Sequence, residues 1–260
     1  AAGSGFPRLA RCLREGYPLV LLVGFWTEVG YLLPMLHSTM NDGLVARLDL
    51  AVFGQHWNNS WRQRMPDRWL AELMNFSYFA YLPLIYVPVV IAGIRGQAEA
   101  MRDMVFRLIA TYVGCYLGYL VFPVLGPRAT GAATGLALDG FFASVSEVFR
   151  SHGDSLGTAF PSSHAAGAVA LAIIAARWLR PWAAGLLTLQ AVGVVLATVY
   201  TGNHYAIDAI AGVALAVVVQ LVAVPALLRI LAPASRPTPV PLLPRFGPGF
   251  LPITSTGGDR

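Results

Sequence analysis

Long apolar blocks alternate with short polar segments along most of the chain. Each block is close to the roughly 20 residues that an α-helix needs to cross a bilayer, and prolines mark several block ends. The pattern predicts an all-α, polytopic membrane helix bundle with six transmembrane helices, at residues 17–37, 70–93, 104–125, 162–179, 182–201 and 204–231.

The pattern changes between and beyond these blocks. Residues 43–57 mix apolar and charged positions, which is typical of a helix that lies in the membrane interface. From Pro233 to Pro252 the chain has seven prolines, a composition that favours disorder. We therefore expect an interfacial helix and three parts in all: a cytoplasmic N-terminal segment at 1–16, a six-helix membrane domain at 17–232 and a disordered tail at 233–260.

Composition supports a location in the membrane. Hydrophobic residues make up 56% of the chain and charged residues only 12%, whereas about a quarter of the residues of a soluble domain are charged. All 18 basic residues are arginines without a run of five, so we expect no nucleic-acid binding. With the N-terminus inside, 12 arginines lie on inner segments and six on outer ones, which predicts an integral protein of a bacterial inner membrane with both termini cytoplasmic.

Three polar clusters interrupt the apolar pattern. "FPVLGPRA" ends the third block and contains Arg128, and "PSSH" opens the fourth block and ends in His164. "YTGNHYAIDAIAG" places His204 and Asp208 at the start of the sixth block. Because successive crossings alternate in direction, all three clusters should meet at one membrane face, which the arginine count makes the outer face.

Each cluster also has a purely structural explanation. Ser162 or Ser163 could cap the fourth helix, and Arg128 could be an ordinary interfacial cation. His204 and Asp208 are four residues apart and could be a structural pair on one helix face. Taken together the clusters favour a function, because Asp208 should lie in the apolar zone, where ionisable residues are costly and usually functional.

The clusters contain the groups that phosphoryl transfer needs. A neutral histidine can attack phosphorus when a carboxylate holds the proton on its other ring nitrogen, and His204 with Asp208 has the spacing for this. The transition state spreads negative charge over three oxygens, which Arg128 and the amides of a helix N-terminus can stabilise. His164 can protonate the leaving oxygen as a general acid.

"PSSH" followed by "NHYAID" resembles the motifs of the type 2 phosphatidic acid phosphatase superfamily, which includes vanadium haloperoxidases and sphingolipid head-group synthases. The resemblance covers roughly residues 120 to 215 and extends weakly to "LDLAVFG" upstream. It implies a metal-independent enzyme with no cofactor, whose substrate is a lipid phosphate in the bilayer and whose intermediate is a phosphohistidine. It also makes 17–232 a catalytic domain, with the following implied site residues: His204 as nucleophile, Asp208 as its partner, His164 as acid, and Arg128, Ser162 and Ser163 as phosphate ligands.

The sequence departs from the family's usual signature of Lys-x6-Arg-Pro, Pro-Ser-Gly-His and Ser-Arg-x5-His-x3-Asp. The leading lysine is absent, Ala129 stands where proline follows the arginine, and Ser163 stands where glycine is usual. Ala197 and Thr198 occupy the place of the Ser-Arg pair. Two of the three usual cations for phosphate are missing, and this reduced set is similar to that of the inositol phosphorylceramide synthase and sphingomyelin synthase branch.

We predict a membrane lipid phosphatase that hydrolyses a lipid phosphate monoester or pyrophosphate at the outer face. A phospho-head-group transferase stays open, because its diester substrate carries one negative charge rather than two and needs fewer cations. A distant arginine such as Arg150 could instead supply a missing cation. Two further alternatives are a metal site on His164, His204 and Asp208 and a non-enzymatic transporter, although broken helices and paired repeats are not evident.

Overall fold

The computed structural model describes residues 5–134, 140–153 and 155–231. These residues form helices joined by short segments, and their one β-bridge links Val124 to Thr158. The helices are α1 (Gly5–Leu36), α2 (Asp42–Phe53), α3 (Trp57–Arg64), α4 (Arg68–Ile94), α5 (Ala98–Val121), α6 (Phe141–Gly153), α7 (Ser163–Trp178), α8 (Pro181–Tyr200) and α9 (Ala206–Val218), which runs through a π-helical turn (Val219–Ala223) into α10 (Val224–Leu231).

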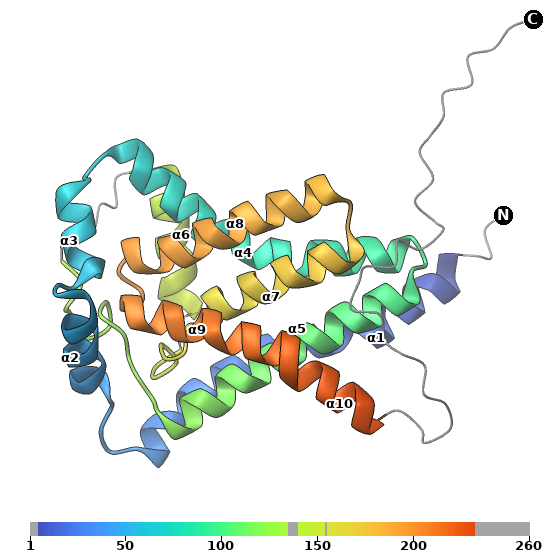
Figure 1. Cartoon of the computed structure of the whole chain (residues 1–260), viewed down its shortest axis with the longest axis horizontal. Coiled ribbons are helices and arrows are strands. Elements are labelled where there is room, and N and C mark those ends of the chain that lie inside the picture. The colour runs from blue at the N-terminus through green and yellow to red at the C-terminus, as the bar shows by residue number, and fades with distance from the viewer. Residues whose placement is uncertain (1–4, 135–139, 154, 232–260) are drawn as a thin grey trace, which may run out of the picture.

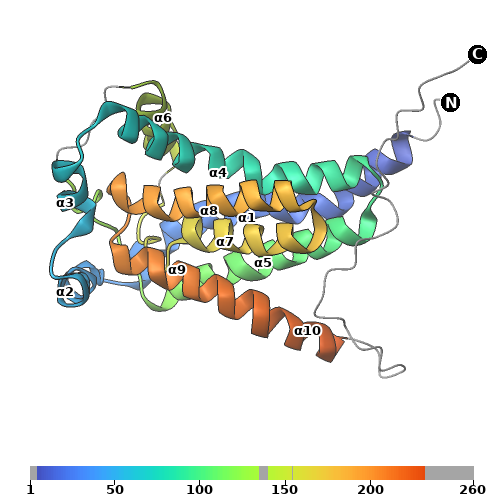
Figure 2. The same cartoon turned by 45° about the horizontal axis from the view of Figure 1, so that its top comes forward.

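The long helices form one bundle. Figure 1 shows α1, α4, α5, α7, α8 and the continuous α9–α10 running along the long axis of the molecule. The short helices α2 and α3 lie across one end of this bundle, and α6 lies beside α4 near the same end (Figure 2). The start of α1 and the end of α10 lie at the other end. The prediction of an all-α polytopic bundle is confirmed.

Helix α7 lies inside the bundle, where it contacts α8, α9, α5 and α4. Small residues make this possible, because Ala165, Ala166 and Ala170 are fully buried. A Cβ on Gly167 would lie 2.3 Å from the Tyr81 hydroxyl. Helices approach most closely where such small residues face each other. The packing fixes α7 and with it the position of the "PSSH" segment at its start.

Five helices are long and apolar enough to cross a membrane: α1 from Cys12 onward, α4, α5, α8 and α9–α10. The protein is therefore an integral membrane protein. Helix α7 has only 16 residues, a length of about 24 Å at roughly 1.5 Å per residue, which is less than the roughly 30 Å of the hydrocarbon core. Helix length and composition thus support five crossings directly, and α7 is a shorter apolar helix between them.

Three segments differ from the sequence-based expectation. Helix α1 begins at Gly5 rather than at residue 17, because the helix continues past the apolar block into residues that also favour helix. The single helix expected at 43–57 is shorter than predicted, because α2 ends at Phe53 and a second short helix, α3, begins at Trp57. Residues 127–160 contain α6, which was not predicted. Its 13 residues are fewer than the roughly 20 of a membrane-crossing block, the length by which helices were recognised in the sequence. The tail predicted at 233–260 lies outside the described residues.

Candidate active site

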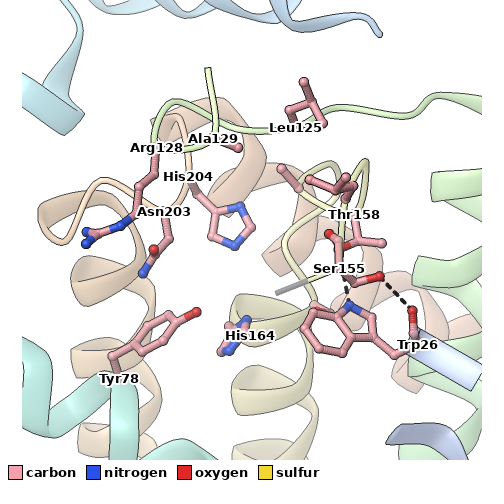
Figure 3. A pocket seen from close by; sticks show the side chains of 13 residues that line it. Trp26, Tyr78, Leu125, Arg128, Ala129, Ser155, Thr158, His164, Asn203 and His204 are labelled. Atoms are coloured by element: carbon pink, nitrogen blue, oxygen red, sulfur yellow. Dashed lines mark hydrogen bonds between the residues drawn. The ribbon is translucent and has the colours of Figure 1, made fainter. Parts of the chain in front are cut away.

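The three polar clusters come together at the end of the bundle that α2 and α3 cover. Figure 3 shows Arg128 from the loop after α5, His164 from the first turn of α7 and His204 from the loop between α8 and α9 around one cavity. Its volume is about 90 Å³. Ser163 and Asn203 also line the cavity. The argument from the alternating direction of successive helices therefore gives the right relative position for all three clusters.

His204 and Asp208 form the pair that the spacing predicts. The Nδ1 atom of His204 lies 3.6 Å from Oδ2 of Asp208, and Asp208 is fully buried. The same Oδ2 accepts a hydrogen bond of 2.9 Å from the backbone N–H of Tyr205, which precedes α9. Asp208 thus caps the first turn of α9 and lies beside the His204 ring. The backbone N–H of His204 donates to the Thr198 backbone carbonyl at 3.0 Å, which holds the loop between α8 and α9.

His164 faces His204 from the opposite side of the cavity, with the two ring centroids 6.2 Å apart. Two tyrosines of α4 hold its ring. Tyr78 stacks on it at 4.5 Å and 17°, and Tyr81 lies against it at 4.8 Å and 38°. The Tyr81 hydroxyl donates to the backbone carbonyl of Ser163 at 3.0 Å. The orientation of His164 is therefore set by α4 as well as by its own helix.

The two serines occupy different positions. Ser162 is the residue before α7, and its Oγ accepts a hydrogen bond of 3.3 Å from the Ala165 N–H. Its own N–H donates to the Asp208 carbonyl at 3.0 Å, so it joins the start of α7 to the start of α9. Ser162 is fully buried, whereas Ser163 lines the cavity. The capping explanation for Ser162 is therefore observed, and Ser163 is the serine at the cavity wall.

Arg128 is held by contacts on both terminal nitrogens. Its Nη1 donates to the Thr201 carbonyl at 3.3 Å, and its Nη2 donates to the carboxylate of Glu147 on α6. The same carboxylate oxygen accepts a hydrogen bond from Nη2 of Arg150. One carboxylate therefore links the arginine of the first motif to a second arginine that lies outside the motifs.

A third arginine, Arg62 on α3, lies near Arg128. Burial and the positive charge of Arg128 lower the pKa of Arg62 to about 10. Its Nη2 donates to the Asn58 carbonyl at 2.8 Å, and its Nε and Nη1 have no hydrogen-bond partner. The sequence argument did not single out Arg62. The signal that could have found it is the unusual number of arginines on the outer segments, which includes Arg62, Arg128 and Arg150.

Two carboxylates of α2 hold the loop that leads to Arg128 and the start of α9. Asp42 accepts hydrogen bonds from the N–H groups of Leu125 and Gly126 at 2.9 and 2.8 Å, in the loop that leads to Arg128. Asp49 accepts from the Ile207 N–H at 3.1 Å, at the start of α9. Burial raises the pKa of Asp49. The sequence argument gave neither residue a role, although Asp49 lies in the upstream segment "LDLAVFG" and a spacing of seven places the two carboxylates two turns apart on one face.

A larger, apolar cavity adjoins the polar one. Its volume is about 430 Å³, and its walls come mainly from α1, α4 and α5. Trp26, Tyr78, Ser163 and His164 line both cavities. We call the smaller one the phosphate cavity and the larger one the tail cavity, after the parts of a lipid phosphate that the sequence analysis predicts as substrate. His164 lies in the wall that the two cavities share.

The side chains of the described segments contain no group of three or more histidines, cysteines, aspartates and glutamates that could hold a metal ion. His164, His204 and Asp208, which the sequence left open as a metal site, do not form such a group.

Comparison with known proteins gives one family. The model of the PAP2 superfamily matches residues 45–222, which include all three polar clusters and α2 from its fourth residue onward. Neither the curated proteins nor the solved structures give a match to the chain.

Proposed function

The chain belongs to the PAP2 superfamily, and we propose that it is a membrane lipid phosphatase that hydrolyses a phosphate monoester or pyrophosphate through a phosphohistidine. The observation that carries this proposal is the position of His204. Its ring lines the phosphate cavity opposite His164, with the Asp208 carboxylate 3.6 Å from its Nδ1. A nucleophile, an acid and a carboxylate that fixes the tautomer are the parts of a covalent phosphoryl-transfer site.

In the first step Nε2 of His204 attacks phosphorus. The N–P bond forms, the bond from phosphorus to the lipid oxygen breaks, and protonated His164 gives its proton to that oxygen. Asp208 keeps the proton of His204 on Nδ1 and stabilises the positive charge that the ring gains. In the second step His164 takes a proton from water, the water oxygen bonds to phosphorus, and the N–P bond breaks. Phosphate leaves and both histidines return to their starting states.

The arginines around the site support hydrolysis over head-group transfer. The motifs alone supply one cation, Arg128, which favours a singly charged diester. Arg150 is joined to Arg128 through Glu147. Arg62 lies near Arg128, and burial together with repulsion by Arg128 lowers the pKa of Arg62. These two residues restore the positive charge that a doubly charged monoester needs.

The proposal is tested by giving the purified protein a panel of lipid phosphates and phosphodiesters with and without alcohol acceptors. We expect free phosphate without a new phosphodiester, and an acid-labile phosphoenzyme that His204→Ala abolishes. His37→Ala is the matched control, because His37 follows α1 at the same end of the bundle, its Nε2 lies 2.9 Å from the Leu120 carbonyl, and it does not line the phosphate cavity. A new phosphodiester in place of phosphate would assign the protein to the transferases instead, and turnover by His204→Ala would refute the nucleophile.

We further propose that the phosphate cavity faces the outside of the cell and that both termini are cytoplasmic. The distribution of arginines supports this orientation. A reporter fused after Pro233 should then report the cytoplasm, and a periplasmic signal would reverse the orientation.

A further inference from the structure

Two buried carboxylates hold the start of α9, one from the helix itself and one from α2. Asp208 accepts the Tyr205 N–H at 2.9 Å and lies beside His204. Asp49 accepts the Ile207 N–H at 3.1 Å. Both carboxylates are fully buried. Because Ile207 directly precedes Asp208, the bond to Asp49 acts on the same helical turn that carries the partner of the proposed nucleophile.

Asp49 is also linked to the surface of the protein. Its second carboxylate oxygen, Oδ2, lies 3.4 Å from Nδ1 of His56, the residue before α3. The ring centroid of His56 lies 6.3 Å from that of Tyr205, and 37% of the His56 side chain is exposed. A line of contacts therefore leads from a partly exposed histidine through Asp49 to the first turn of α9.

The carboxylate of Asp49 is not needed merely to pack α2 against α9. Val45 of α2 and Tyr205 belong to one apolar cluster, against which Ile207 packs. Burial raises the pKa of Asp49, and its charge repels that of Asp208, so a carboxylate is an unfavourable choice for packing alone. A hydrogen bond fixes the distance and the direction of the N–H group that it accepts, whereas apolar contacts are not directional. The bond to Ile207 therefore indicates that the position of this turn matters.

The proposed reaction is sensitive to that position. The Asp208 carboxylate must keep the proton on Nδ1 of His204, and a displacement of about 1 Å in a catalytic group can cost about 100-fold in rate. We propose that Asp49 is a positioning residue, which fixes the first turn of α9 and so aligns Asp208 with His204. His56 holds the Asp49 carboxylate in the orientation that this alignment requires. The inference rests on the proposed phosphatase function and assigns to it two residues outside the three polar clusters.

The first test replaces Asp49 and measures phosphate release from the lipid phosphate of the panel above that the wild type hydrolyses fastest. Asp49→Ala loses the acceptor for the Ile207 N–H, so kcat should fall about 10- to 100-fold. KM should stay within about twofold of the wild type, because no phosphate-binding group is removed. Asp49→Asn keeps one acceptor and should recover kcat to within about threefold of the wild type. Both variants also lose a buried charge, so we expect them to fold.

A double-mutant cycle shows whether Asp49 acts through Asp208. In the Asp208→Asn background the charge that Asp49 aligns is absent, so Asp49→Ala should lower kcat less than about threefold. Asp42→Ala is the matched control, because Asp42 also lies on α2 and accepts backbone N–H groups, but in the loop that leads to Arg128. Its loss should be the same in both backgrounds, since independent contributions add.

His56→Ala is a second variant, which should fold because the His56 side chain is partly exposed. It should lower kcat about 3- to 10-fold in the wild-type background and less than about twofold in the Asp208→Asn background. Equal losses in the two backgrounds would overturn the inference, as would a raised KM with unchanged kcat, or no loss at all. If Asp49→Ala does not fold, His56→Ala decides. Phosphate release from no member of the panel would instead refute the phosphatase proposal.

Discussion

The carboxylate of Asp208 offers a sharp test of the proposed nucleophile, because its two roles can be separated. One role is to accept the Tyr205 N–H at the start of α9, and the other is to place a negative charge 3.6 Å from Nδ1 of His204. Asp208→Asn keeps an oxygen that accepts the N–H and removes only the charge. Two unit charges at this distance interact by about 5 kcal/mol at an effective dielectric constant of about 20.

That energy sets the expected loss of activity. A change of about 1.4 kcal/mol in the activation free energy changes the rate tenfold, so the full interaction would correspond to three to four powers of ten. The asparagine dipole recovers part of it. We therefore expect kcat of Asp208→Asn to fall about 10²- to 10³-fold, measured as phosphate release from a lipid phosphate in detergent micelles.

Stability serves as the control for this experiment. Asp208→Asn should unfold no lower than the wild type, since the cap of α9 is kept and a fully buried charge is removed. Asp208→Ala loses the cap as well, which costs about 1 kcal/mol, and should lower the thermal midpoint in addition to the rate. If Asp208→Asn keeps kcat within threefold of the wild type, the charge on Asp208 is not used by His204 and the proposed pairing is wrong.

Three further predictions concern the surroundings of the site. Vanadate imitates pentavalent phosphorus and should inhibit the proposed reaction. Glu147→Gln should strengthen this inhibition a few-fold at low salt, because a partly exposed negative charge is removed from Arg128 and Arg150; weaker inhibition would mean that Glu147 mainly positions the arginines. Ile85→Trp should fill part of the tail cavity and reduce turnover of long-chain lipid phosphates at least tenfold, while a short water-soluble phosphate ester is hydrolysed normally; equal losses on both would show a general packing defect. Burial raises the pKa of Asp49, so the charged form of Asp49 lowers the stability of the fold. This loss of stability is absent at pH values below the ordinary pKa of about 4, and it is complete at pH values above the raised pKa. Asp49→Asn should therefore raise the thermal midpoint at pH 7, and the gain should shrink as the pH falls; a midpoint lowered at every pH would contradict this.

It could be predicted from the sequence that the three motifs meet, because this depends only on the alternating direction of successive helices. The ends of apolar blocks are visible in the chain, and a bundle that alternates direction leaves few places for Arg128, His164 and His204. It could not be predicted in this way that Ser162 caps α7 and that Ser163 lines the phosphate cavity. It depends on whether α7 starts one residue earlier or later, and such boundaries are uncertain by a residue or two even in structures.

Helix α6 and its contacts could not be predicted from the sequence for a different reason. The helix is short and amphipathic, so neither a bilayer-length search nor a motif marks it. The carboxylate of Glu72 on α4 accepts the N–H groups of Phe142 and Ala143 at 3.0 and 3.1 Å and so fixes the start of α6. This long-range contact helps to place Glu147 and Arg150 at the site. The sequence shows Arg150 as a distant arginine, and the tertiary structure joins it to Arg128 through Glu147.

The match to the PAP2 superfamily begins at residue 45, so α1 lies outside it. All the groups that the proposed chemistry uses lie within the matched residues, whereas Leu19, Leu22 and Trp26 of α1 form part of the tail cavity. Trp26 also lines the phosphate cavity, where its Nε1 donates to the Thr158 hydroxyl at 3.2 Å. Under the proposed function, α1 therefore adds to the wall that contacts the lipid tail, while the reacting groups come from the matched residues. Because His164 lies between the two cavities, a change in α1 can alter which lipid is aligned for attack without altering the phosphoryl-transfer groups themselves.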